Sequence, residues 1–430
     1  MSDSRRATQT GGRVATAGHI PGDVALAVGC PREETLAGFR WRLLADLARL
    51  ESGHTPSRRV PEYWDGGTLP WIGIRDATGN HGRMIDVTNE YITELGEQNS
   101  STRLLPSNTV CLSRTASVGY VVVMGVPMCT SQDFVNWVCG PDLDFRYLKY
   151  VLLAEKEAFL RFASGTTHQT IYFPEVKAFH VLVPGVPKQR AIADVLGALD
   201  DKIESNRRIV QTAVDLARRV LETGSTRVRV RDVAEVQKGL SYKGDGLAKA
   251  GYGLPMVNLG NFKVSGWLDP GRLKHYSGEH KVRHEVVTGD LLVSNTDLTQ
   301  QRVILGRPAL VPPSVGRGLF THHVFVVRTS SDAVRLGLWA QLNGSEFRER
   351  AEGFATGTTV AGMPADALLD FEFNLPGDDA VSEGDELIRR AWSAEAESVT
   401  LAALRDALLP ELLSGRMRVQ DAKLSAERPV

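Results

Sequence analysis

The sequence predicts an α+β fold with a pseudo-two-fold internal repeat. We expect two similar domains with mixed or antiparallel sheets, separated by two long helices that pair as an antiparallel coiled coil. Three observations support this prediction. The phrase FASGTT at residues 162–167 recurs as FATGTT at 354–359, the segments around both copies match in the same order, and a heptad pattern lies between them.

Length and composition limit the class of protein. A chain of 430 residues is too long for one ordinary core, so two or more domains are expected. Hydrophobic content of 42% with 23% charged residues is typical of a soluble globular protein, and the lack of a leading apolar run predicts a cytoplasmic location. The four cysteines show no C-x-x-C spacing and no nearby paired histidines, so we expect reduced thiols and no metal site.

Residues 1–40 are rich in Gly, Ala, Thr and Arg, and we expect a mobile extension without a core function. The first domain is predicted over 41–187 and the second over 226–383. Four further pairs of segments match between them: LADLARLESG with VRDVAEVQKG, TLPWIGIRD with GLPMVNLGN, LLPSNTVCLSRT with VVTGDLLVSNT, and Pro184-Gly185 with Pro376-Gly377. Short strands bounded by Gly, Pro, Asn and Asp dominate both domains, with one helix at 144–163 before the Gly-Thr-Thr phrase.

A central spacer helix is predicted over 188–225. Its apolar seam follows alternating steps of four and three residues: Ile192, Leu196, Leu199, Ile203, Asn206, Val210, Ala213, Ala217 and Val220. The expected partner is a helix within the C-terminal segment 384–430, with Leu401, Leu404 and Leu408 facing inward and Pro410 kinking or ending it. A buried Asn206 would fix the register of the pair, or Asn206 would merely touch solvent at a splayed point.

The spacer helix and the charge distribution suit a DNA-binding protein with two parts. A helix of this length measures about 50 Å at 1.5 Å per residue, roughly 15 base pairs of duplex. Lys and Arg number 9 against 13 Asp and Glu over residues 61–187, and 18 against 15 over 226–376. The second domain is therefore the more plausible direct phosphate binder, and the net charge of −1 excludes an indiscriminate polycation.

Several segments resemble the specificity subunit of type I restriction-modification enzymes. They are SGTTHQTI at 164–171, VLVPGVPKQRAIADVLGALDDKI at 181–203, LADLARLESGHTPSR with LPWIGIRD, and ALLPELLSGRMRV at 407–419. The resemblance covers about residues 41–419, and the combination is more specific than any one segment. The chain departs from the family pattern in its long N-terminal extension and in the second Gly-Thr-Thr phrase, which lacks the Gln and Ile of the first.

The resemblance implies a function in a restriction system used for phage defence. The two domains would be target recognition domains that each read half of a split sequence in double-stranded DNA. The chain itself would carry no catalysis and no cofactor. Two modification subunits that methylate adenine with S-adenosylmethionine would clasp its helices, and restriction-translocase subunits using ATP and Mg²⁺ would complete the complex, with no membrane partner.

Candidate DNA-binding residues lie in polar loops between strands, because Arg, Asn and Gln distinguish base edges best and Ser and Thr support them. In the first domain they are Arg75, Asn80, His81, Arg83, Ser113, Arg114, Thr115 and Ser117, and in the second Asn295, Thr296, Gln300, Gln301 and Arg302. The Gly-Thr-Thr phrases add Thr166, Thr167, His168 and Gln169, and Thr358 and Thr359. Those phrases suit a phosphate-binding loop or, equally, a tight helix-to-strand turn.

Two alternatives belong to other classes of protein. Asp142 with Glu175 and Lys177 imitates a metal-dependent nuclease signature. Asp142 also fits a helix cap and Glu175 a first helical turn, and the second domain has no equivalent. A coiled-coil scaffold that binds no DNA would keep the heptads but would not explain two domains with polar loops. His322 and His323 are expected to alternate across a strand rather than to bind metal.

Overall fold

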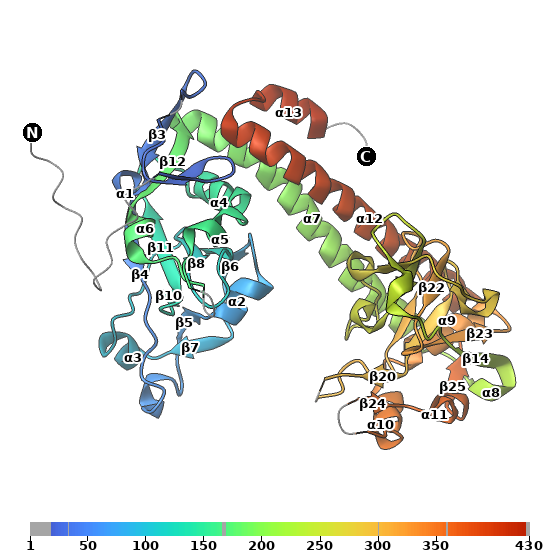
Figure 1. The fold of residues 1–430 in the computed structure, drawn as a ribbon. Helices are drawn as coiled ribbons and strands as arrows, with labels where there is room; N and C mark the ends of the chain where they lie inside the picture. The colour runs from blue at the N-terminus through green and yellow to red at the C-terminus, as the bar shows by residue number, and fades with distance from the viewer. Residues whose placement is uncertain (1–18, 33, 166–168, 300, 358–359, 427–430) are drawn as a thin grey trace, which may run out of the picture. The chain divides into compact units, whose positions relative to one another are not determined.

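The computed structural model describes residues 19–32, 34–165, 169–299, 301–357 and 360–426 (Figure 1). The chain divides into two compact units. Unit 1 contains the residues up to Lys202 and those from Thr400 onward, and unit 2 runs from Ile203 to Val399. Both long helices, α7 (Val186–Leu221) and α12 (Asp378–Ser414), contribute residues to both units.

Unit 1 is built around a five-stranded mixed sheet. Its order is β4 (Ala48–Ser52), β11 (Phe134–Cys139), β8 (Val110–Ser113), β9 (Val121–Met124) and β6 (Met84–Ile85). The strands pair antiparallel except β6 and β9, which are parallel. Strands β8 and β9 are buried along their whole length, as their nearly unbroken apolar sequences require.

Two smaller sheets and six short helices complete the domain of unit 1. The sheets are β10 (Cys129–Thr130), β5 (Leu69–Ile72), β7 (Glu90–Ile92), and β1 (Ile20–Pro21), β2 (Leu26–Val28), β12 (Phe179–Pro184), β3 (Phe39–Leu43). The helices are α1 (Leu44–Leu47), α2 (Ile74–Gly79), α3 (Glu94–Gln98), α4 (Phe145–Ala154), α5 (Ala158–Phe162) and α6 (Phe173–Lys177). A 3-10 turn covers Pro61–Tyr63, and α13 (Val419–Ala426) follows α12.

Unit 2 repeats this succession of elements. A four-stranded sheet corresponds to the five-stranded sheet of unit 1 and has the order β14 (Ala234–Lys238), β23 (Val324–Thr329), β19 (Leu291–Ser294), β21 (Pro308–Leu310). A five-stranded sheet has the order β15 (Leu247–Ala248), β17 (Lys274–Tyr276), β16 (Leu254–Val257), β22 (Gly318–Phe320), β18 (Glu285–Val286). Two further sheets have two strands each, β13 (Thr226–Arg229) with β25 (Glu372–Leu375), and β20 (Thr296–Asp297) with β24 (Ala361–Gly362). Helices α8 (Val230–Val233), α9 (Asp332–Gln341), α10 (Ser345–Gly353) and α11 (Ala365–Leu369) correspond to α1, α4, α5 and α6. The predicted internal repeat is confirmed.

One glycine shows why matching sequence segments give matching backbones. Gly53 in unit 1 and Gly239 in unit 2 both directly follow an edge strand, β4 and β14 respectively. A Cβ atom would lie 2.1 Å from the Ser131 carbonyl oxygen at Gly53, and 2.3 Å from that of Thr321 at Gly239. Only glycine allows the two chain segments to approach this closely, so the recurring glycine reflects a repeated crossing of strands.

The two long helices pair antiparallel, as Figure 1 shows with α7 in green and α12 in red. In unit 1, Arg405 of α12 donates from Nη1 to Oδ1 of Asp200 on α7 at 2.8 Å. In unit 2, Leu221 near the end of α7 lies against Gly384 near the start of α12. Helix α12 continues through Pro410 to Ser414, so this proline does not end it.

The expected seam residues are buried to different degrees. Ile192, Leu196, Leu199, Ile203, Asn206, Leu401 and Leu408 are buried, whereas Val210 and Leu404 are partly buried. Asn206 is only 1% exposed, and its Nδ2 donates to Oε2 of Glu397 at 2.7 Å. The alternative in which Asn206 merely touches solvent is therefore wrong. A buried amide with a partner on the facing helix suits a residue that fixes register.

The expectation of a mobile extension over residues 1–40 is wrong for the part that the structure describes. Strand β2 pairs with β12, and Leu26, Ala27 and Val28 are each 1% exposed. The buried carboxylate of Glu155 accepts hydrogen bonds from the backbone N–H groups of residues 23 to 26 at 2.5–3.1 Å. These bonds fasten the N-terminal segment to the domain, and residues 1–18 lie outside the described part.

The single helix expected at 144–163 is also interrupted. Glu155 is the C-cap of α4 and leaves helical geometry, with φ −102° and ψ 14°, before α5 begins at Ala158. Unit 2 has the same break between α9 and α10. The break is thus a feature of the repeated backbone, and in unit 1 it is where Glu155 accepts from the amides of the N-terminal segment.

Replacing a seam residue with a charged one is expected to destabilise the helix pair. Leu199 is 4% exposed, so Leu199→Asp buries an unpaired carboxylate and should lower the free energy of unfolding by more than about 3 kcal/mol. Leu216, on the same helix but 42% exposed, provides the matched control Leu216→Asp. Chemical denaturation of both variants tests this, and equal stability of the two would contradict the seam assignment.

Removing the Glu155 carboxylate is expected to release the N-terminal segment. Glu155→Ala leaves four backbone donors without their acceptor and should cost about 2–4 kcal/mol. Hydrogen exchange of the amides of residues 23–26 should accelerate, while Glu157→Ala, at an exposed position with no cap hydrogen bond, should leave it unchanged. Unaltered exchange in the Glu155 variant would show that strand pairing alone holds the segment.

Candidate nucleic-acid interface

The two Gly-Thr-Thr phrases occupy equivalent places in the two units. In unit 1 the N–H and carbonyl groups of Ser164 and Thr170 bond to each other, and in unit 2 those of Thr356 and Gly362 do the same. Gly165, which follows Ser164, and Gly357, which follows Thr356, have left-handed backbones, with φ of 112° and 99°. Each phrase thus forms a loop closed at its base. Thr166, Thr167, His168, Thr358 and Thr359 lie outside the described residues.

Each closed loop docks against the end of a central strand. The N–H of Ile171 donates to the carbonyl of Arg114 just after β8, and that of Met363 to the carbonyl of Asn295 just after β19, both at 2.8 Å. The strands end in Ser113 and Ser294, which are both buried. The same backbone scaffold therefore places a strand end beside a Gly-Thr-Thr loop in both units.

Ser113 must be removed from the candidate base-reading residues. Its side chain is 0% exposed, its Oγ donates to the carbonyl of Ser117, and it accepts from the N–H of Tyr120 at 2.8 Å. Ser294 does the equivalent in unit 2, where its Oγ donates to the carbonyl of Ile304. Both hydroxyls shape the loop that follows the strand and are not available to a base.

Asn295 is corrected for the same reason. It is 2% exposed, and its Nδ2 donates to the carbonyl of His322 at 3.1 Å. Its counterpart Arg114 is only partly buried, and the guanidinium lies 4.9 Å over the ring of Phe173. Burial lowers the pKa of Arg114, and its buried Nε has no hydrogen-bond partner among the described residues. Because Arg114 is partly exposed, unlike Asn295, it remains a candidate for contact with a ligand.

His81 and Asn80 serve the fold of unit 1. The Nδ1 of His81 accepts from the N–H of Val121 at 3.1 Å, and the ring meets Tyr120 edge to face. Burial, with the charges of Lys156 and Arg405, lowers the pKa of His81 to about 4, so it is neutral at neutral pH. Asn80 caps α2 and donates to the carbonyl of Asp76.

The other candidates in unit 1 differ in exposure. Arg75 on α2 and Gln169 are exposed, whereas Arg83, Thr115 and Ser117 are partly buried. The Thr115 hydroxyl pairs with that of Thr170 at 2.9 Å. Arg75 and Gln169 are thus the side chains most accessible to a large ligand.

In unit 2, Gln301 is exposed, and Arg302 is partly buried with a left-handed backbone at φ 50°. Thr296 forms a hydrogen bond with Nδ1 of His323 at 2.9 Å. Gln300 lies outside the described residues. Lys238, Lys274, Tyr242 and the histidine pair near Thr296 were missed as candidates, because they come from separate strands and no local sequence pattern joins them.

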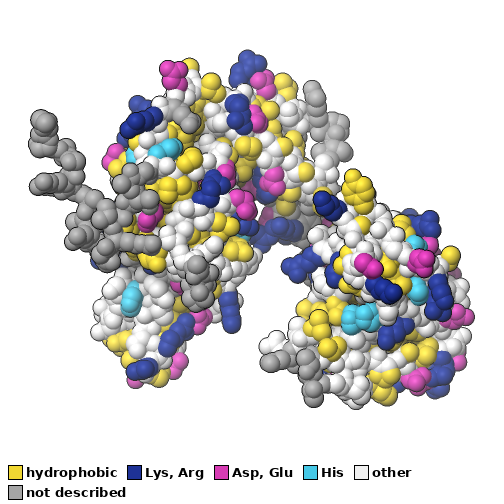
Figure 2. All heavy atoms as spheres, viewed as in Figure 1, with side chains coloured by type: hydrophobic (Ala, Val, Ile, Leu, Met, Phe, Trp, Pro, Cys, Tyr) yellow, Lys and Arg dark blue, Asp and Glu magenta, His cyan; other side chains and the backbone are white. Residues whose placement is uncertain are grey.

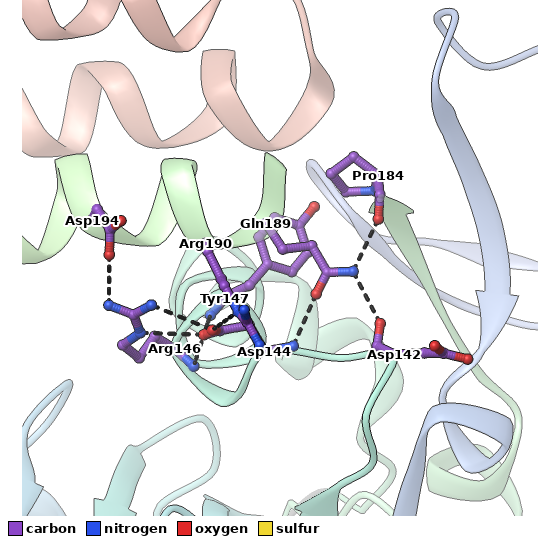
Figure 3. A network of polar contacts seen from close by, with 8 residues as sticks. All are labelled: Asp142, Asp144, Arg146, Tyr147, Pro184, Gln189, Arg190 and Asp194. Carbon is purple, nitrogen blue, oxygen red and sulfur yellow. Dashed lines mark hydrogen bonds and ion pairs between the residues drawn. The ribbon is translucent and has the colours of Figure 1, made fainter. Parts of the chain in front are cut away.

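The start of α7 is fixed to the domain of unit 1 by a buried glutamine (Figure 3). Gln189 is 1% exposed, donates from Nε2 to the carbonyls of Asp142 and Pro184, and accepts from the N–H of Asp144. Figure 3 also shows Arg146 reaching from α4 to Asp194 on α7, at 2.6 Å. Both contacts hold the helix against the domain that would read DNA.

The nuclease alternative gains no support from this geometry. Asp144, and not Asp142, caps α4, so the cap expected at Asp142 is wrong by two residues. Asp142 is exposed, while Glu175 lies buried in the first turn of α6, as expected. Within the described residues no three His, Cys, Asp or Glu side chains form a group that could hold a metal ion. In the same part of the chain, no helix is both long and apolar enough to cross a bilayer.

Comparison with known proteins finds similar sequences and a similar fold. Residues 39–213 match the family model of the type I restriction modification DNA specificity domain. The MjaIX specificity subunit of Methanocaldococcus jannaschii is 29% identical over 167 residues, 38% of either protein. The EcoR124I/EcoR124II specificity subunit of Escherichia coli is 27% identical over 37% of this chain and 40% of its own length. The chain thus matches well under half the length of these curated relatives.

A solved structure extends the similarity of fold to most of the chain. The S subunit of a type I restriction-modification system from M. genitalium superposes with a TM-score of 0.55 at 13% identity, covering 89% of this chain and 98% of that one. Residues 39–213 are therefore similar to the type I restriction modification DNA specificity domain, and the expected resemblance to the specificity subunits of type I restriction-modification enzymes is confirmed.

Proposed function

We propose that the chain is the DNA-binding specificity subunit of a type I restriction-modification complex and reads a site in two parts. One observation supports this most directly. Both units present a strand end docked to a Gly-Thr-Thr loop through the same backbone bonds, yet the accessible side chains of the adjoining loops differ: Arg114 in unit 1, and Gln301 and Arg302 in unit 2. A duplicated scaffold with different side chains at the same place suits two readers of different sequences.

Residues 41–187 and 226–383 are the proposed target recognition domains, with 188–225 and 384–430 as spacer helices and tail. The matched family model covers the first domain, and the repeat of elements relates the second to it. The side chains proposed to contact DNA within the described residues are Arg75, Arg83, Arg114, Thr115, Ser117, Gln169, Thr296, Gln301 and Arg302. Arginine would recognise guanine, and glutamine adenine.

The proposed partners are double-stranded DNA, two modification subunits and restriction-translocase subunits in the cytoplasm. S-adenosylmethionine, ATP and Mg²⁺ would bind to those subunits, while this chain would select the DNA sequence. Methylation-sensitive sequencing of DNA from the source cell, with and without this chain, tests the proposal. A split adenine-methylated motif that disappears with the chain is expected, and methylation that persists unchanged would refute the role.

Substitution of one arginine is expected to relax only one half of the site. Arg75 belongs to unit 1 and Arg302 to unit 2, so Arg75→Ala and Arg302→Ala should relax opposite halves of the methylated motif. A bidentate contact to guanine discriminates by about 1–3 kcal/mol. Arg231→Ala, which removes an arginine ion-paired with Asp370, is the control and should leave the motif intact. If a substitution weakened binding to all DNA sequences equally, the arginine concerned would contact a phosphate and not a base.

The purified chain is expected to catalyse nothing without its partners. Incubation with DNA, Mg²⁺, ATP and S-adenosylmethionine should yield neither cleavage nor hydrolysis nor methylated product, because the metal-binding groups of the nuclease alternative do not form in the described residues. Adding the modification subunits should restore methylation. Cleavage that is lost on Asp142→Ala would instead establish the nuclease.

A further inference from the structure

Two adjacent histidines of unit 2 lie where several strands end. His322 and His323 lie in the turn from β22 into β23, and their ring centroids are 3.9 Å apart. The N–H of His322 donates to the carbonyl of Leu240, just beyond β14, and Nδ1 of His323 bonds to Thr296 on β20. The pair is thus held from two sides, and Nε2 of His323 is the nitrogen that can bind a ligand.

The surroundings of the pair are positively charged. Burial, followed by the charges of His322, Lys238 and Lys274, lowers the pKa of His323. Lys274 donates to the hydroxyl of Tyr242 at 2.9 Å, which positions its ammonium group. Asp297, which follows Thr296 on β20, is buried, and its carboxylate already accepts from the N–H groups of residues 299, 304 and 305.

The cluster adjoins an open pocket of about 360 Å³ in unit 2, which Lys238, Thr296 and Gly362 line among other residues. Gly362 closes the base of the Gly-Thr-Thr loop, so pocket and loop share a wall. On the face of unit 2 seen in Figure 2, histidine and Lys or Arg side chains lie among apolar ones. Buried Nδ1 of His322 has no hydrogen-bond partner among the described residues. These features leave donors and positive charge beside an accessible cavity.

Unit 1 shows that the fold does not require this charge. Its equivalent turn contains Gln132 and Asp133, and the carbonyl of Asp133 accepts from the N–H of Arg114 just as the carbonyl of His323 accepts from that of Asn295. Ser52 ends β4 where Lys238 ends β14. The backbone is therefore repeated, whereas unit 2 has Lys238 and His323 where unit 1 has Ser52 and the carboxylate of Asp133. A charge that the scaffold does not need is best explained by a ligand.

We propose that His322, His323, Lys238 and Lys274 bind a phosphate of the DNA backbone in the half of the site contacted by unit 2, and that the histidine pair takes up a proton when it does so. This inference rests on the proposed DNA-binding function. Ammonium groups and imidazolium N–H groups donate to phosphate oxygens in charge-assisted bonds. In unit 2 the negative charge of the bound phosphodiester takes the place of the Asp133 carboxylate, which unit 1 carries in its own chain.

The direction of the pH dependence follows from linkage. In the free chain the pKa of His323 lies below its ordinary value of 6.5, so its imidazole is neutral at neutral pH. Bound phosphate favours the protonated form and raises that pKa. The histidine contribution to binding is thus fully present below the free-chain pKa and is lost as pH rises through the higher pKa of the complex. DNA affinity should fall with rising pH, by up to about tenfold per pH unit for the one proton taken up.

The test uses the full chain with its partner subunits and a labelled duplex that carries the split motif found by methylation sequencing. Binding is measured by fluorescence anisotropy at about pH 6 and about pH 8 at constant ionic strength. His322→Gln with His323→Gln should remove most of the difference in affinity between the two pH values. His275→Gln is the matched control, because residue 275 lies between Lys274 and Tyr276 on β17 and therefore points to the opposite face of that strand.

A second variant keeps the inference testable if the histidine variant fails to fold. Lys238 is exposed, and Lys238→Ala should weaken binding to the motif duplex and to a scrambled duplex alike, lowering the salt slope by about one. Equal pH dependence in the wild type and the histidine variant would overturn the proposal. Loss of discrimination at one base pair, with the pH dependence retained, would overturn it too, since the histidines would then read a base. Failure of the wild type to prefer the motif duplex at either pH would instead refute the DNA-specificity function.

Discussion

The structure depends most on the pairing of α7 with α12, because neither long helix could bury its apolar stripe alone. Unit 1 secures the pair through Asp200 and Arg405, and unit 2 through Asn206 and Glu397. Each unit then attaches its own domain to the pair by different means. In unit 1, Tyr150 of α4 donates to Asp200, and in unit 2, Trp267 donates to Glu395 of α12. Within each unit, the helix pair is thus the packed element to which the domain is attached.

Repetition of backbone with variation of side chains explains how one scaffold can present two chemistries. The Ser113 and Ser294 hydroxyls, the crossing glycines and the closed Gly-Thr-Thr loops are the same in both units, since they maintain the fold. The residues that follow the two serines, and those of the turn opposite, differ in size and charge. Buried polar groups with internal partners define the shape, and the partly exposed ones beside them are free to vary with the ligand.

Much of the fold could be predicted from the sequence because its signals are local or periodic. The heptads between the domains and the ordered matches around the two Gly-Thr-Thr phrases each identify a repeated element. Long-range polar contacts were not predictable in this way. Glu155 resembles a solvated helical residue until the amides of residues 23–26 are brought to it. Asn295 resembles a base reader until the carbonyl of His322 is found beside it. Sequence indicates which loops are polar, but not which of their side chains the fold has already used.

The carboxylate of Glu155 has a practical consequence for building hybrid chains. An exchange of the first domain that cut the chain near residue 41 would separate this carboxylate from the amides it accepts, and β2 from its place beside β12. The hybrid chain would then contain a domain from one parent, in which the buried carboxylate lacks its hydrogen-bond donors, and an N-terminal hairpin from the other parent. A junction placed before Ile20 would transfer the N-terminal segment together with Glu155, so that domains could be exchanged without destabilising the hybrid chain.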